Sequence, residues 1–191
     1  MSLASGSVRV RTLTSLISTG TETIVLSRKF APGTHWDDWV KYPFYPDYAA
    51  IGEVVEVGAE VVNLKPGMKV ATRQSHGSEH VVAVSDCYLV PKEIDSSEAA
   101  WFALAKIAFM GVKAGRVGLG SRVLIVGGGP IGQMALRWCR AAGAEQIVVV
   151  DLLEARLDLA QRGGATAVIA KPIDEAIGET ENACGGKPQI V

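Results

Sequence analysis

The residues best suited to chemistry are three glycines and one acid, placed where a predicted strand turns into a predicted helix. Gly127, Gly129 and Gly132 form the pattern G-x-G-x-x-G directly after an apolar run. Asp151 follows nineteen residues after Gly132, at the end of a second apolar run. This order of strand, glycine turn, helix, strand and acid is typical of a dinucleotide-binding βαβ unit.

Each part of this motif has a chemical purpose. The first glycine allows a tight turn, the second lets the backbone approach a pyrophosphate, and the third lets the helix pack close to the strand. Pro130 and Ile131 open a helix whose N-terminus offers free N–H groups and a partial positive charge to phosphates. Asp151 would accept hydrogen bonds from the ribose hydroxyls of adenosine. The alternative is a βαβ turn that binds no nucleotide.

The residues that follow Asp151 favour NAD over NADP. Leu152 and Leu153 come directly after the acid, with no Arg or Lys beside them. The 2′-phosphate of NADP would therefore meet a carboxylate and no cation. We expect NAD to be the cofactor.

Composition excludes several other classes of partner. The chain has 191 residues, of which 48% are hydrophobic, and a net charge of −1 with no basic run, which argues against nucleic-acid and membrane-surface partners. Its three cysteines lie far apart and form no C-x-x-C pair, so we expect a reducing, cytoplasmic location. We see no signal peptide and no apolar run of membrane-spanning length.

The first half of the chain is predicted to consist of short strands. Residues 8–14 alternate between apolar and polar side chains, as in a half-buried strand, and a polar glycine turn is expected at 17–22. Further strands are expected at 51–58, 69–72, 80–84 and 87–90. Short strands at this spacing, separated by Gly and Pro, favour a small antiparallel barrel.

An aromatic-rich loop at residues 31–48 interrupts these strands. Its aromatic residues are Trp36, Trp39, Tyr42, Phe44, Tyr45 and Tyr48. Such a loop either covers a small core or lines a cleft, and covering a core is the commoner arrangement.

The pattern changes after residue 95. Asp95 and Glu98 resemble a capping box, and a largely apolar helix is expected at 99–114. Strands are then expected at 123–126, 147–150 and 167–170, helices at 131–142, 153–162 and 172–180, and the start of a fourth strand at 188–191. This alternation predicts a parallel sheet with helices on both faces.

We therefore expect three regions in an α/β plus β fold. A β-barrel domain would occupy residues 1–95, a bridging helix 96–120, and the first half of a Rossmann domain 121–191.

Several stretches together resemble the medium-chain dehydrogenase/reductase superfamily, the zinc-type alcohol and polyol dehydrogenases and their relatives. They are 52–58 with 64–70, 79–91 and 121–169. Met68 replaces an aspartate that is usual in the family. The resemblance covers nearly the whole chain. It implies a GroES-like barrel, an active site in the cleft against the coenzyme domain, hydride transfer between NAD and a small alcohol or carbonyl substrate, and a homo-oligomer.

The chain departs from the zinc-binding members at the positions of the catalytic metal ligands. Where those members have a cysteine, a histidine and a third ligand, this chain has Ser18, Tyr48 and, approximately, Phe102. Because zinc prefers thiolate, imidazole or carboxylate, we expect no zinc at this site. The four-cysteine structural zinc lobe is also missing. His76 and His80 lack a third nearby ligand, so we interpret them as polar residues of the barrel or the surface.

Without zinc, hydride transfer still needs a proton donor or acceptor. Lys106 stands out in the otherwise apolar stretch 103–109, and the resemblance implies a position close to the nicotinamide. In an apolar cleft its pKa would be lowered by desolvation, so it could act as acid or base. Alternatively, it reaches water or pairs with an acid such as Glu22. Tyr48 is a second candidate, as hydrogen-bond donor to a substrate carbonyl, and Ser18 completes the candidate set.

The resemblance further implies that both ends of the chain are incomplete. The family's coenzyme domain continues beyond the fourth strand, in which this chain stops, and the family usually has one more strand before Val8. The half-sheet would have the strand order 3-2-1-4, with unpaired backbone along the edge of strand 4. We expect either a fragment or a partner chain at that edge. A non-catalytic dinucleotide-binding protein, or an inactive fragment, is the alternative function.

Overall fold

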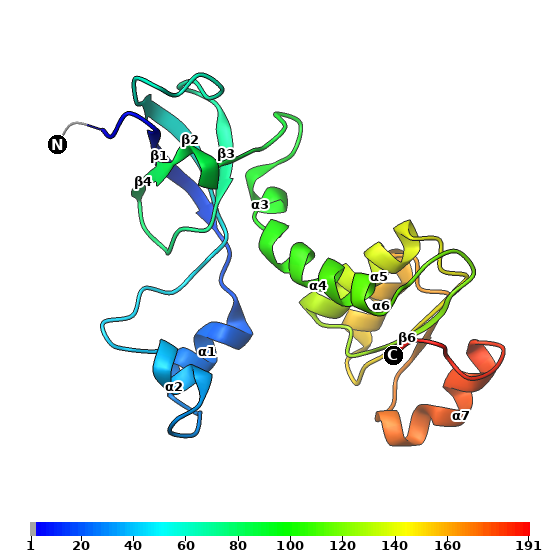
Figure 1. Ribbon diagram of the computed structural model, residues 1–191. Coiled ribbons are helices and arrows are strands. Elements are labelled where there is room, and N and C mark those ends of the chain that lie inside the picture. Colours follow the sequence, from blue (N-terminus) through cyan, green and yellow to red (C-terminus); the bar gives the residue numbers. More distant parts are fainter. Residues whose placement is uncertain (1–2) are drawn as a thin grey trace. The chain divides into compact units, whose positions relative to one another are not determined.

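The chain folds into two units, each built on its own sheet and core (Figure 1). The computed structural model describes residues 3–191; the first unit ends at Ala103 and the second spans Leu104–Val191. An antiparallel sheet organises the first unit and a parallel sheet the second. Within the described residues, no helix is long and apolar enough to cross a membrane.

The sheet of the first unit has five strands in the order β4-β1-β2-β3-β5. They are β1 (Ser7–Ser15), β2 (Ala50–Val57), β3 (Lys69–Thr72), β4 (Glu79–Ala83) and β5 (Tyr88–Leu89), with a 3-10 turn, η1 (Val84–Asp86), before β5. The strands lie close to the predicted positions. Because alternate residues point to the same face, Val8, Val10 and Val54 share one buried cluster.

The barrel predicted for this unit is not confirmed. The described strands form an antiparallel sheet in which β4 and β5 are the two ends of the order. The core of this unit is a cluster of buried residues that includes Leu64, Val70 and Val82. Barrel closure therefore stays a prediction.

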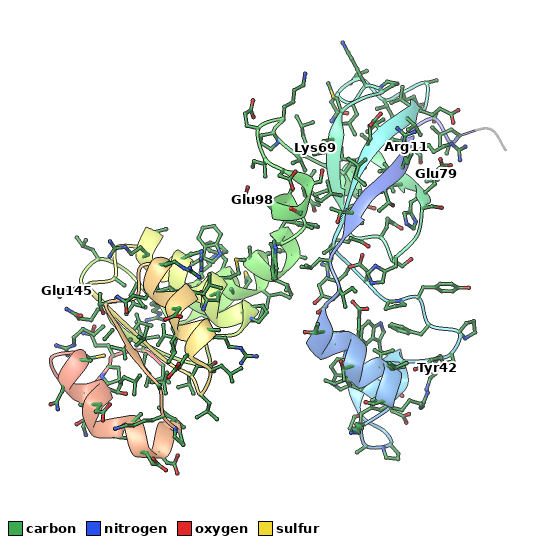
Figure 2. All side chains as sticks on the ribbon, turned by 180° about the vertical axis from the view of Figure 1, so that it is seen from behind. Arg11, Tyr42, Lys69, Glu79, Glu98 and Glu145 are labelled. Atoms are coloured by element: carbon green, nitrogen blue, oxygen red, sulfur yellow. The ribbon has the colours of Figure 1, made fainter. Side chains whose placement is uncertain are left out.

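Ion pairs cross the outer face of this sheet. Arg9 contacts Glu56 at 2.9 Å and Glu79 at 3.2 Å, and Arg11 contacts Glu53 at 3.4 Å. Figure 2 labels Arg11 and Glu79 on this sheet. Such exposed pairs contribute only about 0–1 kcal/mol each. The valines on the other face determine the register, because a shift by one residue would move them into water.

The segment after β1 is a helix, and the prediction of a glycine turn at 17–22 is wrong. Helix α1 spans Thr19–Ser27. Its first turn closes when the amide of Glu22 donates to the carbonyl of Ser18 at 2.9 Å. The Glu22 carboxylate in turn accepts from the amide of Ser18 at 2.7 Å. Threonine, glycine, isoleucine and valine are weak helix formers, so composition hides a helix that these capping bonds stabilise.

The aromatic-rich loop contains the short helix α2 (His35–Trp39) and packs largely on itself. The ring of Trp39 lies 5.6 Å from that of Trp36 and 5.1 Å, edge-on, from that of Phe44. Tyr42 and Phe44 also border a cavity of about 350 Å³ beside α1. The loop thus forms a small aromatic cluster and lines a cleft at the same time.

After β5 in the sequence, two helices occur where one long helix was expected. They are α3 (Ser96–Ala99) and α4 (Phe102–Ala114). Asp95 caps α3 as predicted, accepting from the amide of Ser97 at 2.8 Å.

The second unit alternates strands and helices as predicted. The elements are β6 (Arg122–Val126), α5 (Pro130–Ala141), β7 (Gln146–Val150), α6 (Glu154–Arg162), β8 (Ala167–Ile169) and α7 (Ile173–Ala183). The three strands pair in parallel in the order β6-β7-β8. Ile190 forms a parallel bridge to Val123 on the other edge of β6, with the amide of Leu124 donating to the Ile190 carbonyl at 2.9 Å. The predicted strand order of this half-sheet is therefore confirmed.

Both faces of the parallel sheet are covered. One cluster joins Ile147 and Val149 to Leu136 of α5 and Leu157 of α6, while a second lies beside α7. Burial on both faces explains why β6 and β7 are continuous apolar runs.

The packing of α5 on this sheet gives a direct test of the fold. Leu136 is 0% exposed at the centre of the cluster, whereas Leu159 of α6 is 41% exposed. We expect Leu136→Ala to lower the free energy of unfolding by about 2–5 kcal/mol, because it leaves a cavity. Leu159→Ala is the matched control and should cost clearly less in urea denaturation. An equal loss in the two variants would contradict this packing.

Candidate functional site

The glycine motif forms a tight turn between β6 and α5. Gly127 has a φ of +98°, a conformation that favours glycine. A Cβ on Gly132 would lie 1.9 Å from the carbonyl oxygen of Gly127, so the helix can pack against the turn only without a side chain there. A Cβ on Gly129, in contrast, would meet nothing within 4 Å. The backbone at Gly129 is therefore bare and accessible, as a pyrophosphate requires.

Asp151 closes this turn from the end of β7. Its Oδ2 accepts from the amide of Gly128 at 2.7 Å, and its Oδ1 accepts from the amide of Leu153 at 2.9 Å. Burial alone would raise the pKa of this carboxyl. The amides of Leu153 and Gly128, together with Arg156, outweigh that effect and hold the pKa of Asp151 below its usual value. The acid is therefore ionised at neutral pH.

Two further side chains support the turn, and the sequence argument missed both. Gln133 is buried, and its Nε2 donates to the carbonyls of Gly128 and Arg156, each at 2.9 Å. Arg156 places Nη1 3.3 Å from Oδ2 of Asp151. The expectation that no cation lies beside Asp151 is therefore wrong. Arg156 is five residues from the acid in sequence, and the first turn of α6 brings it back to the carboxylate.

A hollow of about 800 Å³ lies over this turn within the second unit. Gly127, Gly129, Pro130, Ile131, Gly132 and Arg156 all line it. The amides at the start of α5 have no partners within the helix, so they can bind an anion. The glycine turn and the start of α5 are thus suited to holding the phosphates of a dinucleotide, whereas Asp151, the expected ribose acceptor, is not among the residues that line the hollow.

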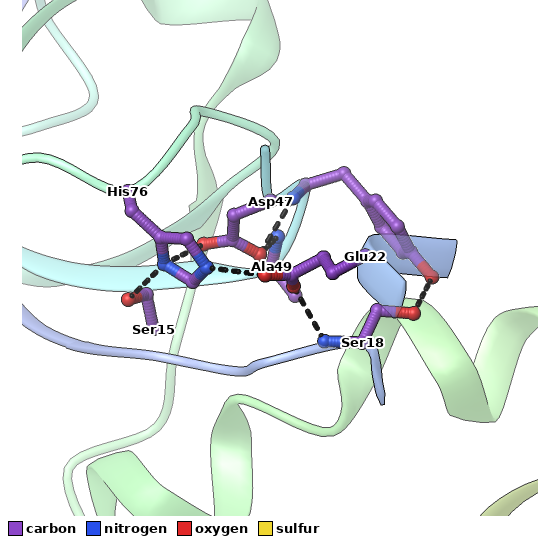
Figure 3. Close-up of polar contacts among 7 residues, drawn as sticks. Ser15, Ser18, Glu22, Asp47, Ala49 and His76 are labelled. Atoms are coloured by element: carbon purple, nitrogen blue, oxygen red, sulfur yellow. Dashed lines mark hydrogen bonds and ion pairs between the residues drawn. The ribbon is translucent and has the colours of Figure 1, made fainter. Parts of the chain in front are cut away.

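A second polar site lies in the first unit, where Ser18 and Tyr48 meet (Figure 3). Ser18 precedes α1 and Tyr48 precedes β2, yet their hydroxyl oxygens are 2.6 Å apart. Ser18 is 8% exposed. The guanidinium carbon of Arg73 lies 5.8 Å from the centre of the Tyr48 ring. Two of the three predicted catalytic residues are therefore in direct contact.

Two carboxylates bind the backbone next to this hydroxyl pair, and an imidazole contacts both carboxylates. Glu22 accepts from the amide of Ser18, and Asp47 accepts from the amide of Tyr48 at 2.6 Å. Burial raises the pKa of Asp47, whose side chain is fully enclosed. His76 contacts both acids, at 3.3 Å each. His80 lies on β4 with a buried Nε2.

The chemistry of this pair does not fit a catalytic zinc ion. A serine hydroxyl and a neutral phenol are weak zinc ligands, and here they bind each other. Phe102, at the approximate position of the third ligand, has no donor atom. Among residues 3–191, no group of three or more His, Cys, Asp or Glu side chains is arranged to hold a metal ion. What the pair can do is donate and accept hydrogen bonds at a substrate oxygen.

Lys106 lies on α4 in the second unit, and its side chain is exposed. Glu22, its suggested partner, lies in the first unit, where it binds the amide of Ser18 and contacts His76. The proposed role of Lys106 as acid or base stays a prediction.

Known proteins resemble this chain in both sequence and fold. A family model described as "Zinc-binding dehydrogenase" matches residues 130–191. Human sorbitol dehydrogenase is 30% identical over 79% of this chain and 52% of its own length. L-threonine 3-dehydrogenase of Bacillus licheniformis is 30% identical over 71% of this chain and 49% of its own length. The chain belongs to the medium-chain dehydrogenase/reductase superfamily.

Solved structures of this superfamily share the fold. Galactitol-1-phosphate dehydrogenase from Escherichia coli matches 96% of this chain and 60% of its own, with a TM-score of 0.75 and 19% identity. Escherichia coli quinone oxidoreductase, solved with NADPH, matches 96% of this chain and 56% of its own, with a TM-score of 0.73 and 21% identity. The chain spans about half the length of the curated superfamily members that it matches.

The lowered pKa of Asp151 leads to a pH-dependent contribution to stability. Because that pKa is lower in the folded than in the unfolded chain, the ionised carboxylate stabilises the fold at pH values above about 4. This contribution is lost as the pH falls through the lowered pKa. We expect Asp151→Asn to reduce the free energy of unfolding at pH 7, and the difference from wild type to narrow as the pH falls below about 4.

Denaturation in urea at several pH values would measure this difference. Asp158→Asn, an exposed acid on α6, is the control and should match wild type throughout. A cost for Asp151→Asn that does not change with pH would contradict the assignment.

Proposed function

We propose that this chain forms the NAD-binding portion, and part of the catalytic portion, of a zinc-independent oxidoreductase. This enzyme transfers hydride between a nicotinamide cofactor and a small alcohol or carbonyl substrate. The observation that carries the proposal is the glycine turn between β6 and α5, closed by the ionised Asp151. The relatives, which include sorbitol and threonine dehydrogenases, support the reaction class.

Within this proposal, the cofactor is held by the second unit. The bare backbone at Gly129 and the amides of Ile131 and Gly132 receive the pyrophosphate. Asp151 accepts hydrogen bonds from the adenosine ribose. When bound, the nicotinamide supplies or accepts the hydride.

NAD is the proposed cofactor, with NADP as the weaker ligand. The ionised Asp151 repels a 2′-phosphate, and it also pairs with the guanidinium of Arg156 beside it. Removing the acid would leave Arg156 free to bind a 2′-phosphate. The carboxylate thus determines the preference.

The hydroxyls of Ser18 and Tyr48 are the proposed contacts to the reacting oxygen of the substrate. A hydrogen bond from Tyr48 to a carbonyl oxygen stabilises the negative charge that develops as hydride arrives. Ser18, 2.6 Å away, orients the phenol or passes a proton to it. Lys106 is proposed as a further acid or base on α4.

The proposed organisation follows the superfamily. Residues 1–95 form a GroES-like barrel that contributes to catalysis, 96–120 a bridging helix, and 121–191 the first half of a coenzyme domain. The sheet order of the first unit supports an antiparallel arrangement that barrel closure would extend. Assembly into a homo-oligomer is part of the same proposal.

Cofactor preference can be tested by titrating NADH and NADPH and following the fluorescence of the reduced nicotinamide. We expect wild type to bind NADH more tightly than NADPH, because Asp151 repels the 2′-phosphate. Asp151→Asn should shift the ratio of the two affinities toward NADPH by about tenfold or more, which corresponds to about 1.4 kcal/mol. Adding Arg156→Ala to that variant should remove the gain. If neither nucleotide binds to wild type, the proposed function is wrong.

Turnover with a panel of polyols and aldehydes tests the zinc-independent chemistry. We expect activity to survive dialysis against a metal chelator, and Tyr48→Phe to lower kcat by about 10²–10⁴-fold, the range typical of a lost proton donor. Tyr45→Phe is the matched control, since that ring is 73% exposed. Chelator-sensitive activity would contradict zinc independence, whereas tight NADH binding with no turnover would favour the non-catalytic alternative.

A further inference from the structure

His76 lies between two carboxylates that come from different parts of the first unit (Figure 3). Its Nε2 is 3.3 Å from Oε2 of Glu22 on α1, and its Nδ1 is 3.3 Å from Oδ2 of Asp47, which precedes β2. Nδ1 is also 2.8 Å from the hydroxyl of Ser15, at the end of β1. His76 itself follows β3 and donates its amide to the carbonyl of Pro46 at 2.9 Å. One imidazole therefore joins segments before β2, after β3 and around α1.

Each of the two carboxylates uses its other oxygen to hold the backbone of a hydroxyl residue. Oε1 of Glu22 accepts from the amide of Ser18 at 2.7 Å. Oδ1 of Asp47 accepts from the amides of Tyr48 and Ala49, at 2.6 and 2.8 Å. The same two acids that contact His76 thus fix the main chain at both members of the Ser18–Tyr48 pair.

The burial of Asp47 makes the imidazole necessary. The Asp47 side chain is 0% exposed, and its Oδ2 has no hydrogen-bond partner apart from the ion-pair contact to His76. A buried carboxylate oxygen without a compensating donor is costly, so without the ring this carboxylate would rotate or draw in water. Either change would disturb the bond from Oδ1 to the amide of Tyr48. Glu22 depends on His76 in the same way but less strongly, because its side chain is 18% exposed and can reach water.

We propose that His76 is a positioning residue, which holds Glu22 and Asp47 so that Ser18 and Tyr48 present their hydroxyls to each other. This inference rests on the proposed function, in which that pair contacts the reacting oxygen of the substrate. A histidine suits the task because its two ring nitrogens point in different directions from one rigid plane, and the protonated ring can donate to both carboxylates. A purely structural tie between loops would instead affect stability and leave the hydroxyl pair unchanged.

The phenol of Tyr48 provides a signal that separates these two roles. In a chain labelled with ¹³Cζ-tyrosine, Tyr42, Tyr45, Tyr48 and Tyr88 each give one resonance, and Tyr48→Phe identifies the third. Ser18→Ala defines the chemical shift of Tyr48 without its hydroxyl partner. We expect His76→Ala to move the Tyr48 resonance most of the way to that value and to leave the other three in place. His35→Ala removes an exposed histidine on α2 and is the matched control. It should shift only the resonances of tyrosines next to His35 and leave the Tyr48 resonance in place.

A Tyr48 resonance that stays at its wild-type position in folded His76→Ala overturns the proposal. If His76→Ala does not fold, by circular dichroism and by the other tyrosine signals, Glu22→Gln and Asp47→Asn decide. Each keeps an oxygen for the backbone amide but weakens the contact to His76, so a positioning role requires the Tyr48 resonance to move in both. A Tyr48 resonance that stays at its wild-type position in one or both of these variants overturns the proposal. Because these spectra need no cofactor or substrate, they are independent of NADH binding and turnover, which test the proposed function.

Discussion

The hydrogen bond from the amide of Gly128 to the carboxylate of Asp151 is the constraint on which the second unit depends. It ties the turn after β6 to the end of β7 at 2.7 Å, and the amide of Gly127 adds a bond to the carbonyl of Val150. Gly127 can follow this path because it adopts a positive φ, and α5 can start there because Gly132 has no side chain. In the proposed function the same carboxylate also accepts from a ribose, so one acid would both shape the turn and help to select its ligand.

The first unit uses carboxylates in a similar way at a different kind of site. The carboxylates of Glu22 and Asp47 are directed toward the protein interior. They accept hydrogen bonds from backbone amides and contact the imidazole of His76. Around them, a sheet of alternating valines provides the rigid support, and the hydroxyls of Ser18 and Tyr48 meet where zinc-binding relatives are expected to have metal ligands. In the proposed reaction, this hydrogen-bonded pair would stabilise developing charge by directed donors instead of by a Lewis acid.

The sequence predicted what local patterns encode. The apolar runs of β6 and β7, the glycine turn after β6 and the cap at Asp95 follow from periodicity and spacing, and the structure confirms them. The strand order of the half-sheet followed from the resemblance to the superfamily, and the structure confirms it as well. Helix α1 was missed because its β-branched residues and glycine conceal it. Arg156 and Gln133 were missed because their contacts depend on how α6 and α5 return to the turn. The contact between Ser18 and Tyr48, thirty residues apart, is a tertiary one that no local pattern specifies.

The most direct test of the central claim, a dinucleotide held by the glycine turn, is to titrate ¹⁵N-labelled chain with NADH and follow the backbone amide resonances. The account predicts the largest shifts at Gly128, Ile131 and Gly132, with a smaller one at Asp151, because these amides and this acid surround the phosphates and the ribose. Saturating NADH that leaves these amides unchanged, or that shifts only residues of the first unit, would contradict it.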